Sequence, residues 1–506
     1  MKKSFKAIAL LSMAAVLTCA CATGCSAQKK NSVEQDGKTV FPISSTDDSA
    51  SYSMGDVMPF YDGEVMNIYH LQNSKGSLSM FYHPISRLTT SDFVNYTDCG
   101  ISIDFVEDTK SVDASIGTGS VIKDNNGTYH FFYTGHNDNG TDKDIGLPHK
   151  ECVRHATSPD QETWTKVEDF KLYGNSDDFR DPYLYYDADE NLYNMLVTTR
   201  IGGGVIKRYS AASLNAQSSE WQDRGVFFYN DDGSYNMECP SYIEYNGVYY
   251  LAYSEQGDNR VTHYRYKTEK DGDWKKFERD SIDASGFYAG RLEKAGDKLY
   301  AFAWCANLTG GSTGDFDWGG NLVVHELKQL SSGELCAVMV SDVKNAFSSQ
   351  VQYEFIDGGK IESAAFDGNF AAKCAEKLAT NVTRISFTFS VGNYGGDFGM
   401  TFGLEGKYNN RLGTCAVAFD TAGSKLACYN DISSRVRYGN PLASVAFAYA
   451  AGRAYDVDII IDSEILTVYL DGTVCLTARF PDMRRKNFAF YSNGVEVNIE
   501  GITFYE

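Results

Sequence analysis

The feature that most constrains this chain is a β-hairpin pattern that recurs at long and even intervals. Each copy joins a turn-like pair, such as Asn126-Gly127, to a run of aromatic and β-branched residues, which is typical of a hairpin. The copies are 64, 56 and 51 residues apart when they are counted at Tyr129, Tyr193, Tyr249 and Tyr300. A hairpin unit of roughly 50 to 65 residues is typical of a propeller blade. Residues 53–345 are therefore predicted to form a five-bladed β-propeller.

The pattern changes after about residue 345. Residues 350–506 hold short strand-like runs at close spacing, for example 385–390, 455–462 and 465–472. Such spacing indicates a two-sheet β-sandwich. The chain of 506 residues is too long for one hydrophobic core, and we expect an all-β protein in which this second domain serves support or sugar recognition.

The N-terminal residues have the pattern of a targeting segment. Lys2, Lys3 and Lys6 precede an apolar run at 7–19 that is too short for a permanent membrane-spanning helix. Residues 1–25 resemble a lipoprotein signal, which predicts lipidation at Cys25 with Cys21 as the alternative. Polar residues 26–52 are expected to be a flexible tether. We expect an extracytoplasmic protein anchored in the cell membrane by lipid, or otherwise secreted.

Charge and cysteine content exclude several classes of protein. The net charge of −21 argues against nucleic-acid binding, which needs a basic surface. Nine cysteines follow the signal, an odd number without a Cys-x-x-Cys pair, so we expect neither a zinc site nor a disulfide framework. No phosphate-binding loop or metalloprotease motif is present, and no metal or cofactor is expected.

Three carboxylates occupy similar settings in the propeller segment. Asp56, Asp181 and Glu238 stand three, one and two residues before a proline that opens a strand-like run. Asp181 and Glu238 are 57 residues apart, about one blade, and Asp56 and Asp181 are 125 apart, about two. Equivalent innermost strands would bring all three to one end of the central channel.

Several acids in one pocket fit glycoside cleavage, in which one carboxylate is ionised and another holds a proton. Arg180 beside Asp181 would favour the ionised form of Asp181. Glu238 has no adjacent base in the sequence and is therefore predicted to be the proton donor. Gly55 before Asp56 has no side chain, which is expected to leave room for a ligand.

These residues resemble glycoside hydrolase family 32, the β-fructofuranosidases, levanases and inulinases. The resemblance is carried by Arg180-Asp181-Pro182 and Glu238-Cys239-Pro240, and by Asp283 before Phe287-Tyr288-Ala289. It implies that Asp56 is the nucleophile, Glu238 the acid/base and Asp181 the transition-state stabiliser of a retaining hydrolase. Substrate contacts are expected from Arg180, Gln72, Ser120, Cys239, Tyr288, Trp304 and Trp318.

The sequence departs from the family around the proposed nucleophile. The family has Asn-Asp-Pro-Asn-Gly where this chain has Gly55-Asp56-Val57-Met58-Pro59. The expected substrate is therefore an oligo- or polysaccharide with a β-fructofuranoside bond or another furanoside. Two alternatives stay open: an inverting enzyme resembling glycoside hydrolase family 43, and a catalytically silent carbohydrate-binding lipoprotein.

Overall fold

A computed structural model describes most of the chain beyond its N-terminus. The described residues are 39–47, 50–73, 83–231, 233–257, 260–308, 316–353, 360–361, 371–378, 382–392, 395–402, 415–430, 440–480 and 487–506. The predicted signal, with Cys25 and Cys21, lies outside these residues. No helix among the described residues is long and apolar enough to cross a membrane.

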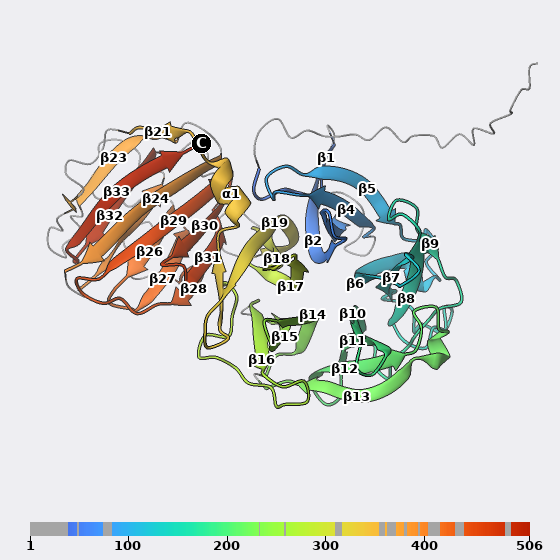
Figure 1. The fold of residues 1–506 in the computed structure, drawn as a ribbon. Helices are drawn as coiled ribbons and strands as arrows, with labels where there is room; N and C mark the ends of the chain where they lie inside the picture. Colours follow the sequence, from blue (N-terminus) through green and yellow to red (C-terminus); the bar gives the residue numbers. More distant parts are fainter. Residues whose placement is uncertain are drawn as a thin grey trace, which may run out of the picture. The chain divides into compact units, whose positions relative to one another are not determined.

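Antiparallel strands form the five blades of a β-propeller, and β2, β6, β10, β14 and β17 lie nearest its centre (Figure 1). The first two blades are β2 Ala50–Tyr61, β3 Met66–Asn73, β4 Ile85–Thr90 and β5 Thr97–Ile103, then β6 Ser115–Lys123, β7 Tyr129–His136, β8 Glu151–Ser158 and β9 Thr165–Lys166. The third and fourth are β10 Phe179–Asp187, β11 Leu192–Arg200, β12 Gly204–Ala211 and β13 Gln222–Tyr229, then β14 Asn236–Tyr245, β15 Val248–Gln256 and β16 Thr262–Lys267. The fifth is β17 Tyr288–Ala295, β18 Lys298–Leu308, β19 Phe316–Gln329 and β20 Leu335–Val338. The predicted all-β propeller is confirmed.

The blades pack face to face, so their middle strands are buried on both sides. In β7, seven consecutive residues from Tyr129 to Gly135 are buried, and the hairpin runs found in the sequence are such middle strands. Two 3-10 turns, η1 Val112–Ala114 and η2 Ser218–Glu220, lie in the connections.

The first and last blades are joined into one nine-stranded sheet. β19 pairs with β2 at Gly320 and Met54. A Cβ atom at Gly320 would lie 1.8 Å from the carbonyl oxygen of Cys305, so only glycine fits at this closing point.

The segment before the propeller differs from the expected tether. Val40 and Phe41 are buried in the propeller core, and the backbone oxygen of Pro42 accepts a hydrogen bond from the amide of Leu322. β1 Ser45–Asp47 then pairs with β2. Residues 39–47 are thus ordered by apolar burial and strand pairing, which the polar composition of the segment concealed.

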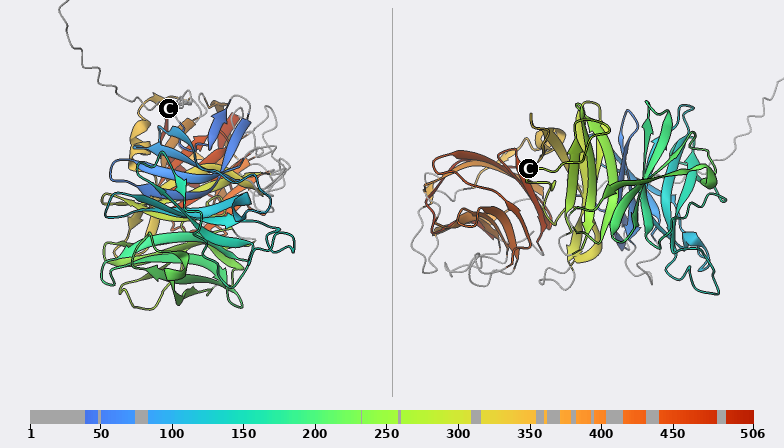
Figure 2. Two further views of the ribbon diagram at one scale, coloured as in Figure 1. Left: turned by 90° about the vertical axis from the view of Figure 1, so that its right-hand side faces the viewer. Right: turned by 90° about the horizontal axis from the view of Figure 1, so that it is seen from below.

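Two antiparallel sheets form the C-terminal β-sandwich, and Figure 2 shows them as two stacked layers. After α1 Ser341–Ala346, one sheet holds β21 Gln350–Val351, β22 Lys360–Ile361, β24 Val382–Val391, β29 Ala454–Asp462, β30 Ile465–Leu470, β31 Val474–Arg479 and β33 Val497–Tyr505. The other holds β23 Ala371–Lys377, β25 Asp397–Phe402, β26 Cys415–Asp420, β27 Lys425–Asn430, β28 Ala443–Ala446 and β32 Asn487–Asn493. Side chains such as Phe387, Phe398 and Phe419 fill the space between them, as expected for aligned sheets. The predicted sandwich is confirmed.

Candidate active site in the propeller channel

Each innermost strand carries a β-bulge at an equivalent level. The pairing register shifts between Gly55 and Val57 in β2, and between Gly117 and Gly119 in β6. Corresponding shifts surround Asp181 in β10, Cys239 in β14 and Ala289 in β17. A bulge turns a residue out of the regular alternation and often lies beside an active site. Five bulges at one level therefore aim five short segments into the same part of the channel.

Three of the bulges hold a non-glycine residue in the left-handed region. The φ angles of Asp181, Cys239 and Ala289 are 58°, 53° and 56°. Such backbone costs about 1–3 kcal/mol and persists where the surrounding structure enforces it. Blades three, four and five thus share a strained residue in the bulge, which is Asp181 in blade three and follows Glu238 in blade four.

Asp56 is held by the neighbouring blades on either side. Thr118 Oγ1, from the bulge of β6, donates to Asp56 Oδ2 at 2.8 Å. Trp304 Nε1, from β18, donates to Asp56 Oδ1 at 3.0 Å. Both carboxylate oxygens therefore accept a hydrogen bond that favours the ionised form.

Glu238 is also held from two blades. Arg180 donates to Glu238 Oε1 from Nε at 3.2 Å and from Nη2 at 2.9 Å. The Tyr288 hydroxyl donates to Glu238 Oε2 at 2.5 Å. Glu238 has no basic neighbour in the sequence, but the guanidinium of Arg180 reaches it from the preceding blade.

Asp181 lies deepest of the three acids, with its side chain almost fully buried. Its Oδ2 accepts a hydrogen bond from the amide of Cys239 at 2.9 Å. Its own amide donates to Thr134 Oγ1 at 3.0 Å. Asp181 is thereby fixed by the blades on both sides of its own.

The three carboxylates lie close enough to affect one another's ionisation. Burial raises the pKa of Asp56, and the charge of Glu238 raises it further. Burial likewise raises the pKa of Glu238, where Arg180 acts in the opposite direction and the charge of Asp181 adds to the rise. The pKa of Asp181 is raised by burial against the opposing charge of Arg180. Acids arranged in this way divide into proton-holding and ionised members.

Trp318 fills the space beside Asp56. A Cβ atom at Gly55 would lie 2.1 Å from Cη2 of Trp318, so the indole occupies the room that the glycine provides. The expectation that this room receives a ligand is wrong. The ring also packs against His83, with centroids 4.3 Å apart.

Three other predicted substrate contacts are held by protein groups. Gln72 Oε1 accepts a hydrogen bond from Ser86 Oγ at 2.5 Å. Ser120 Oγ accepts one from the amide of Leu184 at 2.9 Å, so it ties two blades together. Cys239 is buried and meets Asp181 through its amide. Among the described residues, neither the Gln72 nor the Ser120 side chain forms a hydrogen bond with the three acids, and their contact with substrate stays a prediction.

Two residues of the site were not predicted. Thr118 stands 62 residues after Asp56, which is one blade, and that spacing could have marked it in place of Ser120. The guanidinium of Arg260 lies over the rings of Tyr288, at 4.8 Å, and Trp304, at 5.4 Å. No sequence pattern pointed to Arg260, which lies between β15 and β16.

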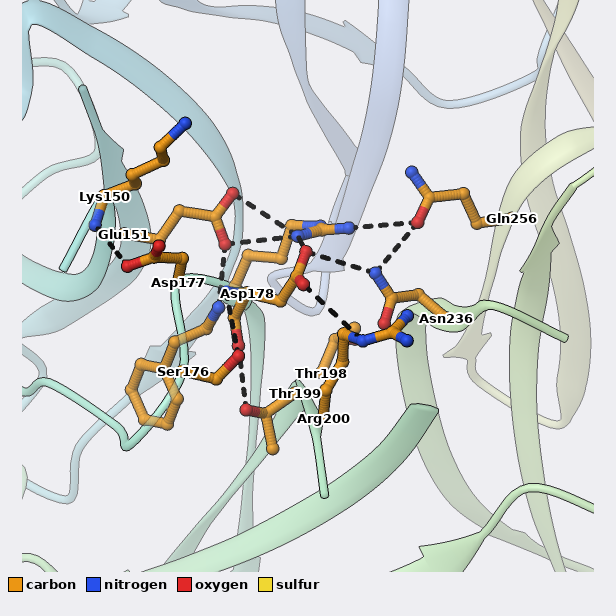
Figure 3. A network of polar contacts seen from close by, with 12 residues as sticks. Lys150, Glu151, Ser176, Asp177, Asp178, Thr198, Thr199, Arg200, Asn236 and Gln256 are labelled. Carbon is orange, nitrogen blue, oxygen red and sulfur yellow. Dashed lines mark hydrogen bonds and ion pairs between the residues drawn. The ribbon is translucent and has the colours of Figure 1, made fainter. Parts of the chain in front are cut away.

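A polar network surrounds Arg180, and its members Glu151, Asp178, Asn236 and Gln256 are labelled in Figure 3. Arg180 Nη1 donates to Asp178 Oδ1 at 2.7 Å and to Glu151 Oε2 at 3.2 Å. Its Nη2 donates to Gln256 Oε1 at 3.2 Å, which also accepts from Asn236 Nδ2 at 2.8 Å. The guanidinium is thus shared among three carboxylates, and its orientation toward Glu238 is fixed.

A second buried cluster contains Asp283, which the sequence comparison had singled out. Asp283 Oδ2 lies 3.0 Å from His325 Nε2, and His325 Nδ1 lies 3.0 Å from the Tyr469 hydroxyl. Asp283 Oδ1 accepts from the amide of Thr477 at 3.0 Å. With Cys475, Asp283 and His325 form the one group among the described residues whose atoms are spaced as metal ligands would be. Hydrogen bonds within this group connect the propeller domain with the sandwich domain, so the cluster has a structural role.

The family model described as "Glycosyl hydrolases family 32 N-terminal domain" matches residues 59–329. Sucrose-6-phosphate hydrolase of Vibrio alginolyticus is 27% identical over 192 residues, which are 38% of this chain and 36% of that protein. The match thus spans little more than a third of the relative's length.

Solved structures share the fold over nearly the whole chain. Sucrose-6-phosphate hydrolase from Lactobacillus gasseri has a TM-score of 0.68 and 19% identity, covering 90% of this chain and 91% of that one. Fructan 1-exohydrolase IIa from Cichorium intybus has a TM-score of 0.67 and 15% identity, covering 90% and 97%. Exo-inulinase from Aspergillus awamori has a TM-score of 0.66 and 13% identity, covering 90% and 95%.

Proposed function

This chain belongs to glycosyl hydrolase family 32, and we propose that it is a retaining glycosidase that cleaves a β-fructofuranoside bond in an oligo- or polysaccharide. The convergence of Asp56, Asp181 and Glu238 on one level of the channel carries the proposal. Each acid comes from a different blade and is held by hydrogen bonds from neighbouring blades.

In the first half of the reaction, an Asp56 oxygen attacks the anomeric carbon of the sugar. The bond between that carbon and the leaving oxygen breaks as Glu238 gives its proton to the leaving group. A covalent glycosyl ester on Asp56 remains, and Glu238 is left as a carboxylate. The donors Thr118 and Trp304 support the ionised form of Asp56 that this step needs.

In the second half, Glu238 takes a proton from a water molecule whose oxygen attacks the anomeric carbon. The ester bond to Asp56 breaks, and the sugar leaves with the configuration that it had in the substrate. Asp181 accepts hydrogen bonds from ring hydroxyls and stabilises positive charge in both transition states. Its burial and the hydrogen bond from the Cys239 amide hold it in place for this role.

The substrate is proposed from the family and from the names of three solved structures that share the fold. These are a β-fructofuranosidase, a fructan 1-exohydrolase and an exo-inulinase. In this chain, Gly55-Asp56-Val57-Met58-Pro59 stands where the family has Asn-Asp-Pro-Asn-Gly, and Trp318 fills the space beside Gly55, so we expect a subsite for the cleaved sugar with its own shape.

The decisive experiment incubates the protein with sucrose, levan, inulin and arabinan and identifies the products by chromatography. Release of fructose with retained configuration, followed by NMR, supports the proposal. Inversion would favour the family 43 type of mechanism, and release of arabinose would identify an arabinoside as the substrate.

Glu238→Gln is expected to lower kcat by about 10²–10⁴, while the exposed Glu244→Gln on the same strand serves as the matched control. Sugar binding without turnover in the unmodified protein would identify a silent binding protein.

Export and membrane anchoring are part of the proposal. The basic and apolar residues before Cys25 support lipidation at that cysteine. Expression with a labelled fatty acid is expected to label the protein, and Cys25→Ala is expected to abolish the label and release the protein from membranes. If Cys21→Ala does so instead, the anchor is at Cys21.

A further inference from the structure

Exposed apolar side chains gather at one end of the third blade. Six large hydrophobic residues are strongly exposed among the described residues, and three of them lie after β10, in the third blade or in the segment that follows it. Ile201 is at the tip of the β11–β12 hairpin and is 56% exposed, Tyr229 ends β13 at 67%, and Tyr235 precedes β14 at 57%. We call Ile201, Tyr229 and Tyr235 the rim patch. Exposed apolar groups that cluster commonly mark a binding surface.

The ring of Tyr235 is held rigidly from one side. The guanidinium of Arg200 lies 3.6 Å from the ring centroid, and its Nη1 donates to the Tyr235 carbonyl oxygen at 2.7 Å. A Cβ atom at Gly204 would lie 2.8 Å from the same oxygen, so the hairpin packs closely on the backbone of Tyr235. One face of the ring is thus covered by Arg200 while more than half of the residue remains in solvent.

The rim patch is continuous with the polar network of the acids. Arg200 Nε lies 3.8 Å from Asp178 Oδ2, and Asp178 binds Arg180 (Figure 3). Tyr235 also stands three residues before Glu238, directly ahead of the innermost strand β14. At about 3.3 Å per residue, its backbone is roughly 10 Å from that of Glu238. Glu238 is the group assigned to protonate the leaving oxygen, so the patch lies on the side of the leaving group.

We propose that the rim patch is a sugar-binding subsite for leaving-group residues beyond the one next to the cleaved bond. This inference rests on the proposed function. The occupant is the second or third sugar of the leaving chain, whose apolar ring face stacks on Tyr235 while Arg200 and Asp178 offer polar partners to its hydroxyls. The preferred substrate is then an oligosaccharide longer than a disaccharide.

The test compares kcat/KM for sucrose, an inulin trisaccharide and an inulin pentasaccharide. Tyr235→Ala is expected to lower kcat/KM for the pentasaccharide about tenfold, which corresponds to about 1.4 kcal/mol, and to leave sucrose unchanged. Tyr235→Phe keeps the ring and is expected to behave as the unmodified protein. Tyr186→Ala is the matched control, because Tyr186 is an exposed tyrosine at the far end of β10 in the same blade.

A second variant separates sugar binding from folding. Ile201→Ser removes apolar surface at the hairpin tip without altering β14, and a smaller loss with the pentasaccharide alone is expected. Equal losses for sucrose and pentasaccharide in Tyr235→Ala, or no loss in either variant, would overturn the inference while leaving the proposed function intact. If the unmodified protein cleaves none of the three sugars, both the proposed function and the proposed subsite are wrong.

Discussion

Arg180 donates two hydrogen bonds to Oε1 of Glu238, at 3.2 Å and 2.9 Å, although Asp181 is its neighbour in the chain. The guanidinium crosses from blade three to blade four and binds Glu151 and Asp178 on its other side. Its positive charge therefore opposes the effect of burial on Glu238. Arg180 sets how tightly the proposed acid holds its proton.

Removing the charge of Arg180 should move the pH dependence of catalysis. A general acid must be protonated in the free enzyme, so activity falls as the pH rises through the pKa of Glu238. Arg180 lowers that pKa, and Arg180→Met should raise it and shift the basic limb of kcat/KM to higher pH. The maximum should drop about 10–10²-fold, because Glu151 and Asp178 lose their shared partner. Arg180→Lys keeps the charge and is the control; a basic limb that moves to lower pH in Arg180→Met would contradict the assignment.

Trp304 should control the acidic limb. Its Nε1 hydrogen bond at 3.0 Å lowers the pKa of Asp56 against the effect of burial, and Asp56 must be ionised to act as the proposed nucleophile. Trp304→Phe should therefore raise that pKa and move the acidic limb to higher pH, with kcat reduced about 10–10²-fold for loss of a hydrogen bond to a charged group. Trp164→Phe is a matched control, since Trp164 donates to the Gln161 carbonyl in blade two. An unchanged acidic limb would remove Trp304 from the support of Asp56.

Gly55 and Trp318 should behave as one unit in stability measurements. A methyl group at position 55 overlaps the indole of Trp318, so Gly55→Ala should lower the free energy of unfolding by about 1–3 kcal/mol. In a Trp318→Ala background the same change should cost little, because the ring is gone. A double-mutant cycle by chemical denaturation measures this coupling. Equal costs in the two backgrounds would show that the overlap is relieved elsewhere.

The period of the hairpins made the propeller predictable, because each blade repeats the same buried middle strand. The same period brought Asp56, Asp181 and Glu238 to one level, since spacings near one or two blades place residues on equivalent strands. Arg180 could not be assigned in this way. The bulge that follows Arg180 decides whether its side chain binds Asp181 or Glu238. The spacing of residues along the sequence does not reveal this bulge.

Contacts between blades that are far apart in the sequence could not be predicted either. Trp304 and Asp56 are 248 residues apart and meet because the last blade closes on the first. The space beside Gly55 looked open in the sequence, yet Trp318 fills it from the closing strand β19. Val40 and Phe41 were hidden in a polar segment and become buried only because the propeller offers them an apolar surface.

Glu293 should make stability depend on pH. This residue of β17 lines a channel cavity with Tyr183 and Arg291, and burial raises its pKa to about 8, above the roughly 4.3 expected in the unfolded chain. The protonated carboxyl group makes its full contribution to the free energy of unfolding below about pH 4. This contribution is lost as the pH rises through about 8, at up to about 1.4 kcal/mol per pH unit. Glu293→Gln should thus gain stability relative to the unmodified protein between pH 5 and pH 8, as measured by chemical denaturation. The exposed Glu64→Gln is the control, and a constant difference across this pH range would mean that Glu293 is ionised in the folded protein.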